Sequence, residues 1–308
     1  MAITKRKFPT ISTRVYKIML LSAALIWGLS FVVMKDTVDV LPPAYLLGVR
    51  FTASGVILAA VFWKRLRTHF DKEHLRNGAI LGVLLFFSFW IQTIGLADTT
   101  PGKNAFLTAT YCVFVPVFAW IVMQRRPTVY NLIAAFLCVA GVGLVSLQGS
   151  LTMRFGDIMT LVSAVFLAIH MVYVAKYAVW GDILVMTIYQ FLVGGLCGLV
   201  VGFCVEPLPS AAVLTPDLFW NMTYLVIFAS CLAIVFQNVG LANVPPAQGA
   251  LFLSLESVFG VLFSVLLYGE ELSLQLIAGF CLIFVAIVVS ETFPLKEVPW
   301  RKKKTTSS

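Results

Sequence analysis

The chain has 308 residues, of which 60% are hydrophobic and 12% are charged, and its net charge is +8. A soluble domain carries about 25% charged residues, so this chain has too little polar surface to face water on every side. Its basic residues stand in short clusters between apolar runs, which is typical of membrane topology signals and not of nucleic-acid binding. We therefore expect an integral membrane protein in contact with the lipid bilayer, with no nucleic acid bound.

Ten apolar runs are long enough to cross a membrane, given that a spanning helix needs about 20 residues. Helices satisfy their own backbone hydrogen bonds in lipid, so the predicted fold class is an all-α integral membrane protein with ten transmembrane helices. The first run lacks a clear small-residue cleavage site, and we treat it as a span and not as a cleaved leader. The predicted spans are 16–35, 42–63, 77–97, 103–123, 129–147, 156–177, 183–204, 218–241, 247–268 and 273–291.

Neither a metal site nor an ATP site is indicated by the sequence. The six cysteines lie mostly inside apolar runs and form no CxxC pair, so we expect them to be small buried hydrophobic residues. A phosphate-binding loop needs GxxxxGK followed by Ser or Thr, but Asn104 follows Gly102 and Lys103 here. We expect no cofactor.

The charge distribution predicts the orientation of the chain. Ten spans place both termini on one side of the membrane. If that side is cytoplasmic, 18 of the 22 basic residues fall in inner segments, and only Lys35 and Arg154 fall clearly in outer ones. This positive-inside bias predicts a multi-pass protein of the cell (plasma or inner) membrane with both termini in the cytoplasm.

An internal repeat divides the chain into two halves. The stretch QTIGLADTTPG at 92–102 returns as QNVGLANVPPA at 237–247, after a shift of 145 residues. The same shift aligns Ala105 with Ala250 and Phe114 with Phe259. We expect one five-helix repeat in residues 1–150 and a second in residues 151–308, around a central cavity. Because five is an odd number, the second repeat enters the membrane from the opposite side.

The charges that follow the repeat support this inversion. The shift places QRRPT at 124–128 against GEELS at 269–273, so a doubly basic segment aligns with a doubly acidic one. In the predicted topology the first is cytoplasmic and the second is external. Inverted repeats are typical of secondary transporters, whose substrate sits near the midplane between the halves and is exposed to each side alternately.

Several segments resemble the EamA-type transporters of the drug/metabolite transporter superfamily. They include WGLSFVVMK, GVRF, NAFLTATYCVFVPVF, GDIMTLVSAVFLAIHMVYV and LFLSLESVFGVLFSVLLYGEELSLQLIAGFCLIF, in this order along nearly the whole chain. The resemblance implies a ten-helix fold of two five-helix repeats with a central cavity. It also implies export of small metabolites, often amino acids or similar compounds. Two departures stand out: Ser257 follows Glu256 where the family often has Pro, and QRRPT stands where it often has Gly-Glu.

Ionisable groups deep in a membrane helix usually face a cavity or a partner, because they are costly in lipid. Glu256 is the one acid predicted near the membrane centre, and it is a candidate to bind a substrate amine or a proton; the alternative is a structural hydrogen bond. Arg50 could hold a substrate carboxylate through two parallel hydrogen bonds, although the interpretation we favour is a structural one, either an ion pair or a side chain that reaches toward the headgroups. Together the two could hold a zwitterion.

Other polar and aromatic residues are candidate walls of the cavity. His170 could relay protons or make one interhelical hydrogen bond. Gln92 and Gln237 occupy equivalent places in the two halves and could line the cavity, although bonding to backbone carbonyls at the turns is the alternative we favour. Ligand pockets are usually aromatic with a few polar groups, which adds the candidates Trp27, Ser30, Trp90, Tyr111 and Tyr189.

We therefore predict a secondary transporter of a small-molecule substrate. A homodimer is compatible with this prediction. A passive facilitator or channel for small solutes is the alternative, and a non-transporting assembly factor is a further one. A membrane-embedded enzyme is disfavoured, because the sequence holds no HExxH, GxSxG or metal cluster and catalysis does not need inverted symmetry.

Overall fold

The computed structural model describes residues 12–124, 128–146, 153–210, 213–244 and 246–292. These residues form helices and connecting loops, with no strand among them. The first half contains α1 (Thr13–Val38), α2 (Pro43–Val61), α3 (Trp63–Thr68), α4 (Lys72–Ala97), α5 (Pro101–Ala109), α6 (Tyr111–Met123) and α7 (Val129–Ser146). The second contains α8 (Phe155–Tyr177), α9 (Ile183–Val205), α10 (Pro216–Tyr224), α11 (Ala233–Asn243), α12 (Pro246–Ser254), α13 (Glu256–Phe263) and α14 (Leu274–Thr292).

Seven helical rods in the described residues are long and apolar enough to cross a membrane. They are α1, α2, α4, α5 with α6, α8, α9, and the rod from α10 to α11, which passes through the π-helix η2 (Leu225–Leu232). Shorter apolar helices occupy 133–144, 252–268 and 274–289. The prediction of an all-helical membrane protein is confirmed, whereas the count of ten spans stays a prediction.

Local signals set where these helices begin. The Asp71 carboxylate accepts hydrogen bonds from the backbone amides of Glu73 and His74, both at 2.9 Å, so α4 begins five residues before the predicted span at 77. Thr100 caps α5 in the same way, and Pro101 occupies its first turn, where no amide hydrogen is needed. Such caps supply hydrogen bonds that the first turn of a helix cannot make internally.

Two of the predicted spans are broken: 103–123 into α5 and α6, and 247–268 into α12 and a second part formed by α13 and a π-helix. The first breaks at Thr110 (φ −61°, ψ −13°) and the second at Leu255 (φ −62°, ψ −13°), and these positions are related by the repeat shift of 145. Each rod then ends on a residue in the left-handed conformation: Gln124 (φ 59°) after α6, and Gly269 (φ 72°) after the π-helix η3 (Ser264–Tyr268). These two positions are related by the same shift, so the repeat extends to backbone geometry.

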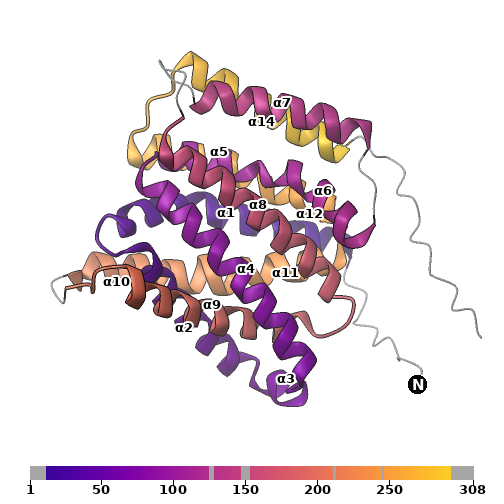
Figure 1. Ribbon diagram of the computed structural model, residues 1–308, viewed down its shortest axis with the longest axis vertical. Helices are drawn as coiled ribbons and strands as arrows, with labels where there is room; N and C mark the ends of the chain where they lie inside the picture. Colours follow the sequence, from indigo (N-terminus) through magenta and orange to yellow (C-terminus); the bar gives the residue numbers. More distant parts are fainter. Residues whose placement is uncertain (1–11, 125–127, 147–152, 211–212, 245, 293–308) are drawn as a thin grey trace, which may run out of the picture.

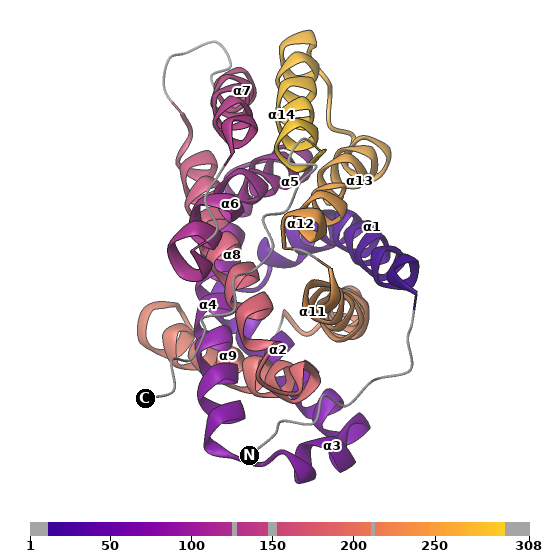
Figure 2. The same cartoon turned by 90° about the vertical axis from the view of Figure 1, so that its right-hand side faces the viewer.

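The helices pack into one bundle with a separate pair at its edge (Figure 1). α2 packs along α9, α4 packs on both α8 and α9, and α1 packs on α11 and α13. The α2–α9 contact is close enough that a Cβ atom added to Gly198 would lie 2.6 Å from the amide nitrogen of Gly48. α7 and α14 pack mainly on each other and lie side by side at one edge in both views (Figure 2).

Polar contacts tie the helices together at one end of the bundle, here called the Glu270 end. The Lys35 ammonium donates to the carbonyls of Leu96 (3.1 Å) and Ala97 (2.8 Å), which joins α1 to α4. The buried Lys103 forms a 2.8 Å ion pair with the buried Asp157, which joins α5 to α8. Glu270, between η3 and α14, bonds to the start of α5.

The opposite end, here called the His74 end, has its own polar junction. Arg65 forms an ion pair with Asp182 at 3.1 Å. The His74 ring bonds Asp71 through Nδ1 (2.6 Å) and accepts the backbone amide of Asp182 at Nε2 (3.0 Å). These contacts fasten the start of α4 to the start of α9.

Candidate functional site

A small cavity lies inside the bundle, between the Glu270 end and the His74 end. Its wall is contributed by α1, α2, α4, α5, α6, α8, α11 and α13. The space open to the centre of a water molecule amounts to about 30 Å³, and one water needs about 10–15 Å³ by that measure. The polar and aromatic lining residues are Trp27, Ser30, Phe31, Arg50, Phe89, Gln92, Thr93, Thr108, Tyr111, Gln237 and Glu256.

The two broken rods deliver Tyr111 and Glu256 to this cavity. Each is the first residue after its break, the repeat shift relates one position to the other, and both are buried. The Tyr111 side chain interacts with the Glu256 carboxyl. Ser257 stands where the family often has Pro. Its hydroxyl donates to the Ser254 carbonyl (2.7 Å), so this bond spans the break at Leu255.

Arg50 of α2 also lines the cavity and has no carboxylate in ion-pair distance among the residues that the structure describes. Its Nε donates to the Ser230 hydroxyl at 2.6 Å and its Nη1 contacts the Met34 sulfur at 3.3 Å. The guanidinium lies over the Phe51 and Phe89 rings, with its carbon 5.6 and 5.5 Å from their centroids. Of the two structural interpretations favoured from the sequence, the ion pair is not found in the described residues, and the side chain is buried in the interior of the bundle.

The second terminal nitrogen of Arg50, Nη2, is buried and has no hydrogen-bond partner within the described part of the chain. Burying a charged donor without a partner is strongly unfavourable. A buried guanidinium at a cavity wall is therefore suited to an anionic ligand, which would supply both the missing acceptor and the opposite charge.

The two equivalent glutamines both line the cavity, and both use their amide nitrogens for side-chain bonds. Gln92 Nε2 donates to the Thr108 hydroxyl at 2.9 Å, and Gln237 Nε2 donates to Asn238 Oδ1 at 3.3 Å. The partners of these nitrogens are thus side chains and not the turn carbonyls favoured from the sequence. With the amide nitrogens engaged, the carbonyl oxygens are the groups suited to accept hydrogen bonds from a ligand.

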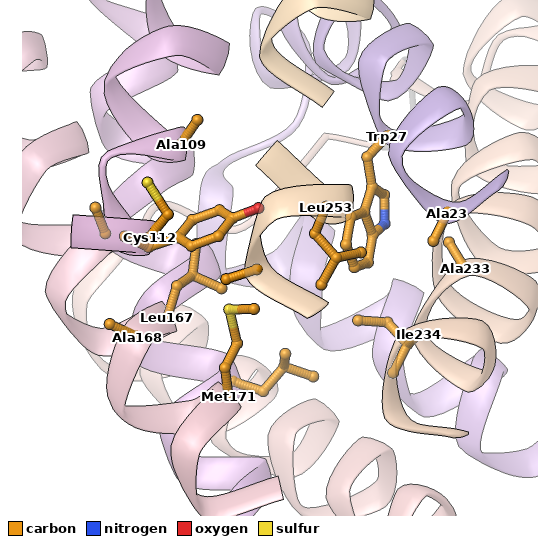
Figure 3. Close-up of a cluster of buried hydrophobic side chains, with 14 of the residues drawn as sticks. Ala23, Trp27, Ala109, Cys112, Leu167, Ala168, Met171, Ala233, Ile234 and Leu253 are labelled. Carbon is orange, nitrogen blue, oxygen red and sulfur yellow. The ribbon is translucent and has the colours of Figure 1, made fainter. Parts of the chain in front are cut away.

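Trp27 and Ser30 form part of the α1 wall, as predicted. The Trp27 indole donates to the Ala229 carbonyl at 2.8 Å, which fixes its ring, and the Ser30 hydroxyl donates to the Trp27 carbonyl at 2.8 Å. Figure 3 shows Trp27 in the same buried cluster as Leu253 of α12 and Met171 of α8. The wall around the polar groups is therefore largely apolar.

Three candidates do not line the cavity. Trp90 stacks on Phe86, with centroids 5.7 Å apart, instead of facing inward. Tyr189 packs its Cβ against Gly78 of α4. His170 is fully buried in a separate polar cluster, where its Nε2 bonds Gln190 Oε1 at 3.2 Å. Asn238 joins this cluster to Gln237, so His170 reaches the cavity only through intermediate side chains.

Sequence reasoning missed several lining residues that helical spacing could have found. Phe31 and Met34 share the face of α1 that carries Trp27 and Ser30, at the three- and four-residue spacing of one helix face. Phe89, Thr93 and Leu96 surround Gln92 on α4 by the same rule. Leu167 and Met171, four apart on α8, complete the apolar wall, whereas His170, the candidate predicted on that helix, does not line it.

The sequence pattern of the EamA-like transporter family matches residues 15–147 and again residues 154–292. The chain belongs to this family. The resemblance noted from the sequence is thereby confirmed, and the protein is a membrane transporter. The family is defined by transport and not by catalysis.

Relatives of the EamA-like family in other organisms have similar length. An uncharacterized transporter of Archaeoglobus fulgidus is 27% identical over 277 residues, covering 87% of this chain and 83% of that protein. The uncharacterized transporter YoaV of Bacillus subtilis is 26% identical over 92% of this chain and 99% of its own. The uncharacterized inner membrane transporter YedA of Escherichia coli K12 is 27% identical over 89% and 91%.

A solved crystal structure supports the fold of this EamA-like protein. It superposes with a TM-score of 0.68 at 17% sequence identity and covers 91% of this chain and 98% of its own. At this identity the likeness concerns the fold alone.

Proposed function

We propose that this protein is a secondary transporter that exports small zwitterionic metabolites, such as amino acids or related compounds, by alternating access. The observation that carries the proposal is that two buried ionisable groups of opposite type line the same cavity. Arg50 stands on one wall with an unsatisfied donor, and Glu256 stands on another beside Tyr111.

The carboxylate of the substrate is assigned to Arg50. A planar guanidinium matches a carboxylate with two parallel hydrogen bonds, and such charge-assisted bonds are about twice as strong as neutral ones. Nη2 is the donor that a ligand would satisfy. The Phe51 and Phe89 rings, whose centroids are 5.8 Å apart, both contact the guanidinium and restrict its orientation.

The ammonium group of the substrate is assigned to the wall that carries Glu256. A carboxyl group and two glutamine carbonyl oxygens provide acceptors there, since Gln92 and Gln237 spend their nitrogens elsewhere. The remaining wall is apolar, with Met34, Leu167 and Met171 among its members. A substrate with a zwitterionic head and a modest apolar side chain fits this combination.

The size of the cavity argues for movement during transport. A space of about 30 Å³ for water centres holds two or three waters at most, so a metabolite can enter only after helices separate. We infer ten membrane spans in two inverted five-helix repeats (1–150 and 151–308), with both termini cytoplasmic. The breaks at Thr110 and Leu255 and the left-handed caps at Gln124 and Gly269, which recur at one shift, support this inference.

The whole cavity is built within one chain, so the proposal applies to a monomer and to a homodimer alike. The driving force is a gradient of substrate or of protons, or exchange of one substrate for another. Charges at QRRPT and GEELS support the sidedness, although residues 125–127 of the first segment lie outside the described residues.

Counterflow in proteoliposomes tests the proposal. Liposomes preloaded with each of a panel of unlabelled amino acids and related metabolites are diluted into the same compound carrying a radiolabel. We expect saturable uptake for a zwitterionic subset, and a loss of at least about tenfold for Arg50→Ala and Glu256→Gln. The exposed residues Arg14 and Glu271 provide matched controls as Arg14→Ala and Glu271→Gln.

Normal counterflow by both Arg50→Ala and Glu256→Gln would overturn the site assignment. Flux that rises linearly with concentration and shows no exchange would identify a passive channel instead. Conversion of the label into a new compound would identify an enzyme.

A further inference from the structure

Glu270 links two helices that lie far apart in the sequence. Its carboxylate accepts hydrogen bonds from the Thr100 hydroxyl and from the Gly102 backbone amide (3.0 Å), both at the start of α5. It also accepts the hydroxyl of Ser264 in η3, at 2.5 Å. One side chain therefore fastens the end of the rod formed by α12, α13 and η3 to the beginning of the rod formed by α5 and α6.

From this arrangement we propose that Glu270 is the latch that keeps the substrate path closed at the Glu270 end, and that it must release α5 before the cavity opens there. The inference goes beyond the proposed substrate and rests on alternating access. In the proposed orientation the Glu270 end faces away from the cytoplasm, so the latch closes the external gate.

Backbone geometry aims Glu270 at its partners. Gly269 takes the left-handed backbone conformation (φ 72°), which residues with a side chain rarely adopt. It turns the chain back over η3. The Glu270 amide then donates to the Ser264 carbonyl at 3.2 Å, which closes the turn. The carboxylate is thus held beside the Ser264 hydroxyl and directed toward α5.

Gly102 makes the close approach possible from the side of α5. A Cβ atom added at this position would collide with the Glu270 carboxylate and would lie 3.3 Å from Ser264 Cβ. Even the smallest substitution at 102 would therefore displace the latch.

The chemistry of the contact suits a strong but releasable bond. A carboxylate with three donors makes charge-assisted hydrogen bonds, and the amides at the start of a helix carry partial positive charge that favours an anion. Unlike the fully buried Asp157 in its ion pair with Lys103, Glu270 is partly exposed and lies in a loop. It can exchange its protein donors for water as the helices part, at little net cost.

The latch residues have no counterpart in the other copy of the repeat. The 145-residue shift carries Thr100 and Gly102 onto Pro245 and Ala247, and it relates Ser264 and Glu270 to Ala119 and Arg125. Neither the acid nor either hydroxyl recurs. The two gates therefore close by different chemistry, and the structure is held closed at the end that has the latch.

Release of the latch acts directly on the substrate site. Both rods joined by Glu270 contribute to the cavity wall. Thr108 and Tyr111 belong to the rod formed by α5 and α6, and Glu256 belongs to the rod formed by α12, α13 and η3. α5 packs closely along α13, so the two helices together cover the path from the cavity to the Glu270 end. The breaks at Thr110 and Leu255 lie beside the cavity, where each rod can bend to open that path.

Labelling of a cysteine in the cavity tests the latch without any knowledge of the substrate. The full-length chain with its six native cysteines replaced by serine carries Thr93→Cys, a cavity position. Intact cells are treated with a small membrane-impermeant thiol reagent. We expect Glu270→Gln to raise the rate of labelling from outside by about tenfold, because the amide cannot accept from all three donors.

The neighbouring acid provides a matched control. Glu271 is exposed, so Glu271→Gln removes the same charge one residue away and should label at the parent rate. Gly102→Ala reaches the latch from the other side and should raise the rate as Glu270→Gln does. Monodispersity in size-exclusion chromatography verifies that each variant is folded; if Glu270→Gln is not, Gly102→Ala and Ser264→Ala decide the question.

Equal labelling rates for the latch variants, Glu271→Gln and the parent would overturn the latch while leaving alternating access intact. Labelling of the cavity cysteine from one side only, in the parent and in every latch variant, would contradict alternating access itself. The failure of the latch and the failure of the proposed function are therefore distinguishable.

Discussion

Tyr111 and Glu256 occupy the same position in the two sequence repeats, and their side chains interact with each other at the cavity wall. Each follows a helix break with nearly identical backbone angles. The repeat therefore brings two chemically different residues to equivalent positions beside each other at the cavity wall. An equivalent pair of identical acids would repel each other, whereas a phenol and a carboxyl group can hydrogen-bond.

Tyr111→Phe should weaken substrate binding while leaving the fold intact. Loss of the phenol leaves the buried Glu256 carboxyl without this partner, and an unsatisfied buried polar group costs about 1–3 kcal/mol. We expect the apparent affinity in counterflow to fall by about tenfold or more. Tyr130→Phe, which removes an exposed phenol on α7, is the control, and identical affinities for the two variants would show that the Tyr111 hydroxyl has no role.

Arg50→Met should abolish transport without lowering the stability of the protein. Methionine keeps the length and apolar stem of the side chain but removes the buried charge, and replacing buried ionic groups by apolar ones is often neutral or stabilising by about 1–4 kcal/mol. We expect an unchanged or raised melting temperature in detergent together with no counterflow. Arg50→Lys should also fail, because an ammonium cannot form the paired bonds of a guanidinium. A destabilised but active Arg50→Met protein would mean that the residue is structural.

The ion pair between Lys103 and Asp157 should show the behaviour of a buried charge pair. Removing one partner leaves an uncompensated charge, so Asp157→Asn should destabilise the protein by about 3–5 kcal/mol. The double variant Lys103→Met with Asp157→Leu should recover most of that loss. Thermal unfolding of all three proteins measures both effects, and a double variant less stable than Asp157→Asn would contradict this account.

Asp71 should make the stability depend on pH in acid. Its pKa lies below the usual 3.8 because the His74 backbone amide, the His74 side chain and the Glu73 amide all favour the carboxylate. A group with a lowered pKa in the folded state stabilises the fold above its unfolded pKa, and this stabilisation is lost as pH falls through the folded pKa. We therefore expect Asp71→Asn to flatten the fall in melting temperature below about pH 4.

A matched acid distinguishes this effect from general acid denaturation. Asp217 also stands in the first turn of a helix, α10, so Asp217→Asn should leave the acid limb of the stability curve unchanged. Equal acid limbs for Asp71→Asn and the parent would show that the Asp71 hydrogen bonds do not contribute.

Hydropathy was sufficient to predict an all-helical membrane protein, but neither it nor the repeat could predict where helices break. Pro116 is the visible break signal in the first repeat, yet α6 continues through it and the break lies at Thr110. The second repeat breaks at Leu255, and Val261 stands at the position equivalent to Pro116. Since no breaker residue is common to both, the position of the breaks cannot be read from a local sequence signal.

The candidate site was predictable to the extent that it depends on residue type. Glu256 and Arg50 stand out because each is an ionisable residue deep in an apolar helix, where burial of a charge is costly. Their sharing of one cavity depends on the packing of α2 and α13 around α1, which no local pattern encodes. For the same reason Trp90 and Tyr189 looked equivalent to Trp27 and Tyr111, although they pack against neighbouring helices and rings outside the cavity.

The pair formed by α7 and α14 gives the described cavity none of its lining residues. Its outer surface is made of large apolar side chains such as Phe136 and Val139. Because these two helices line no part of the cavity, we expect that they can tilt to match a thinner or thicker bilayer without disturbing the selectivity of the transporter. A change in lipid composition would then alter the position of α7 and α14 and leave the substrate cavity unchanged.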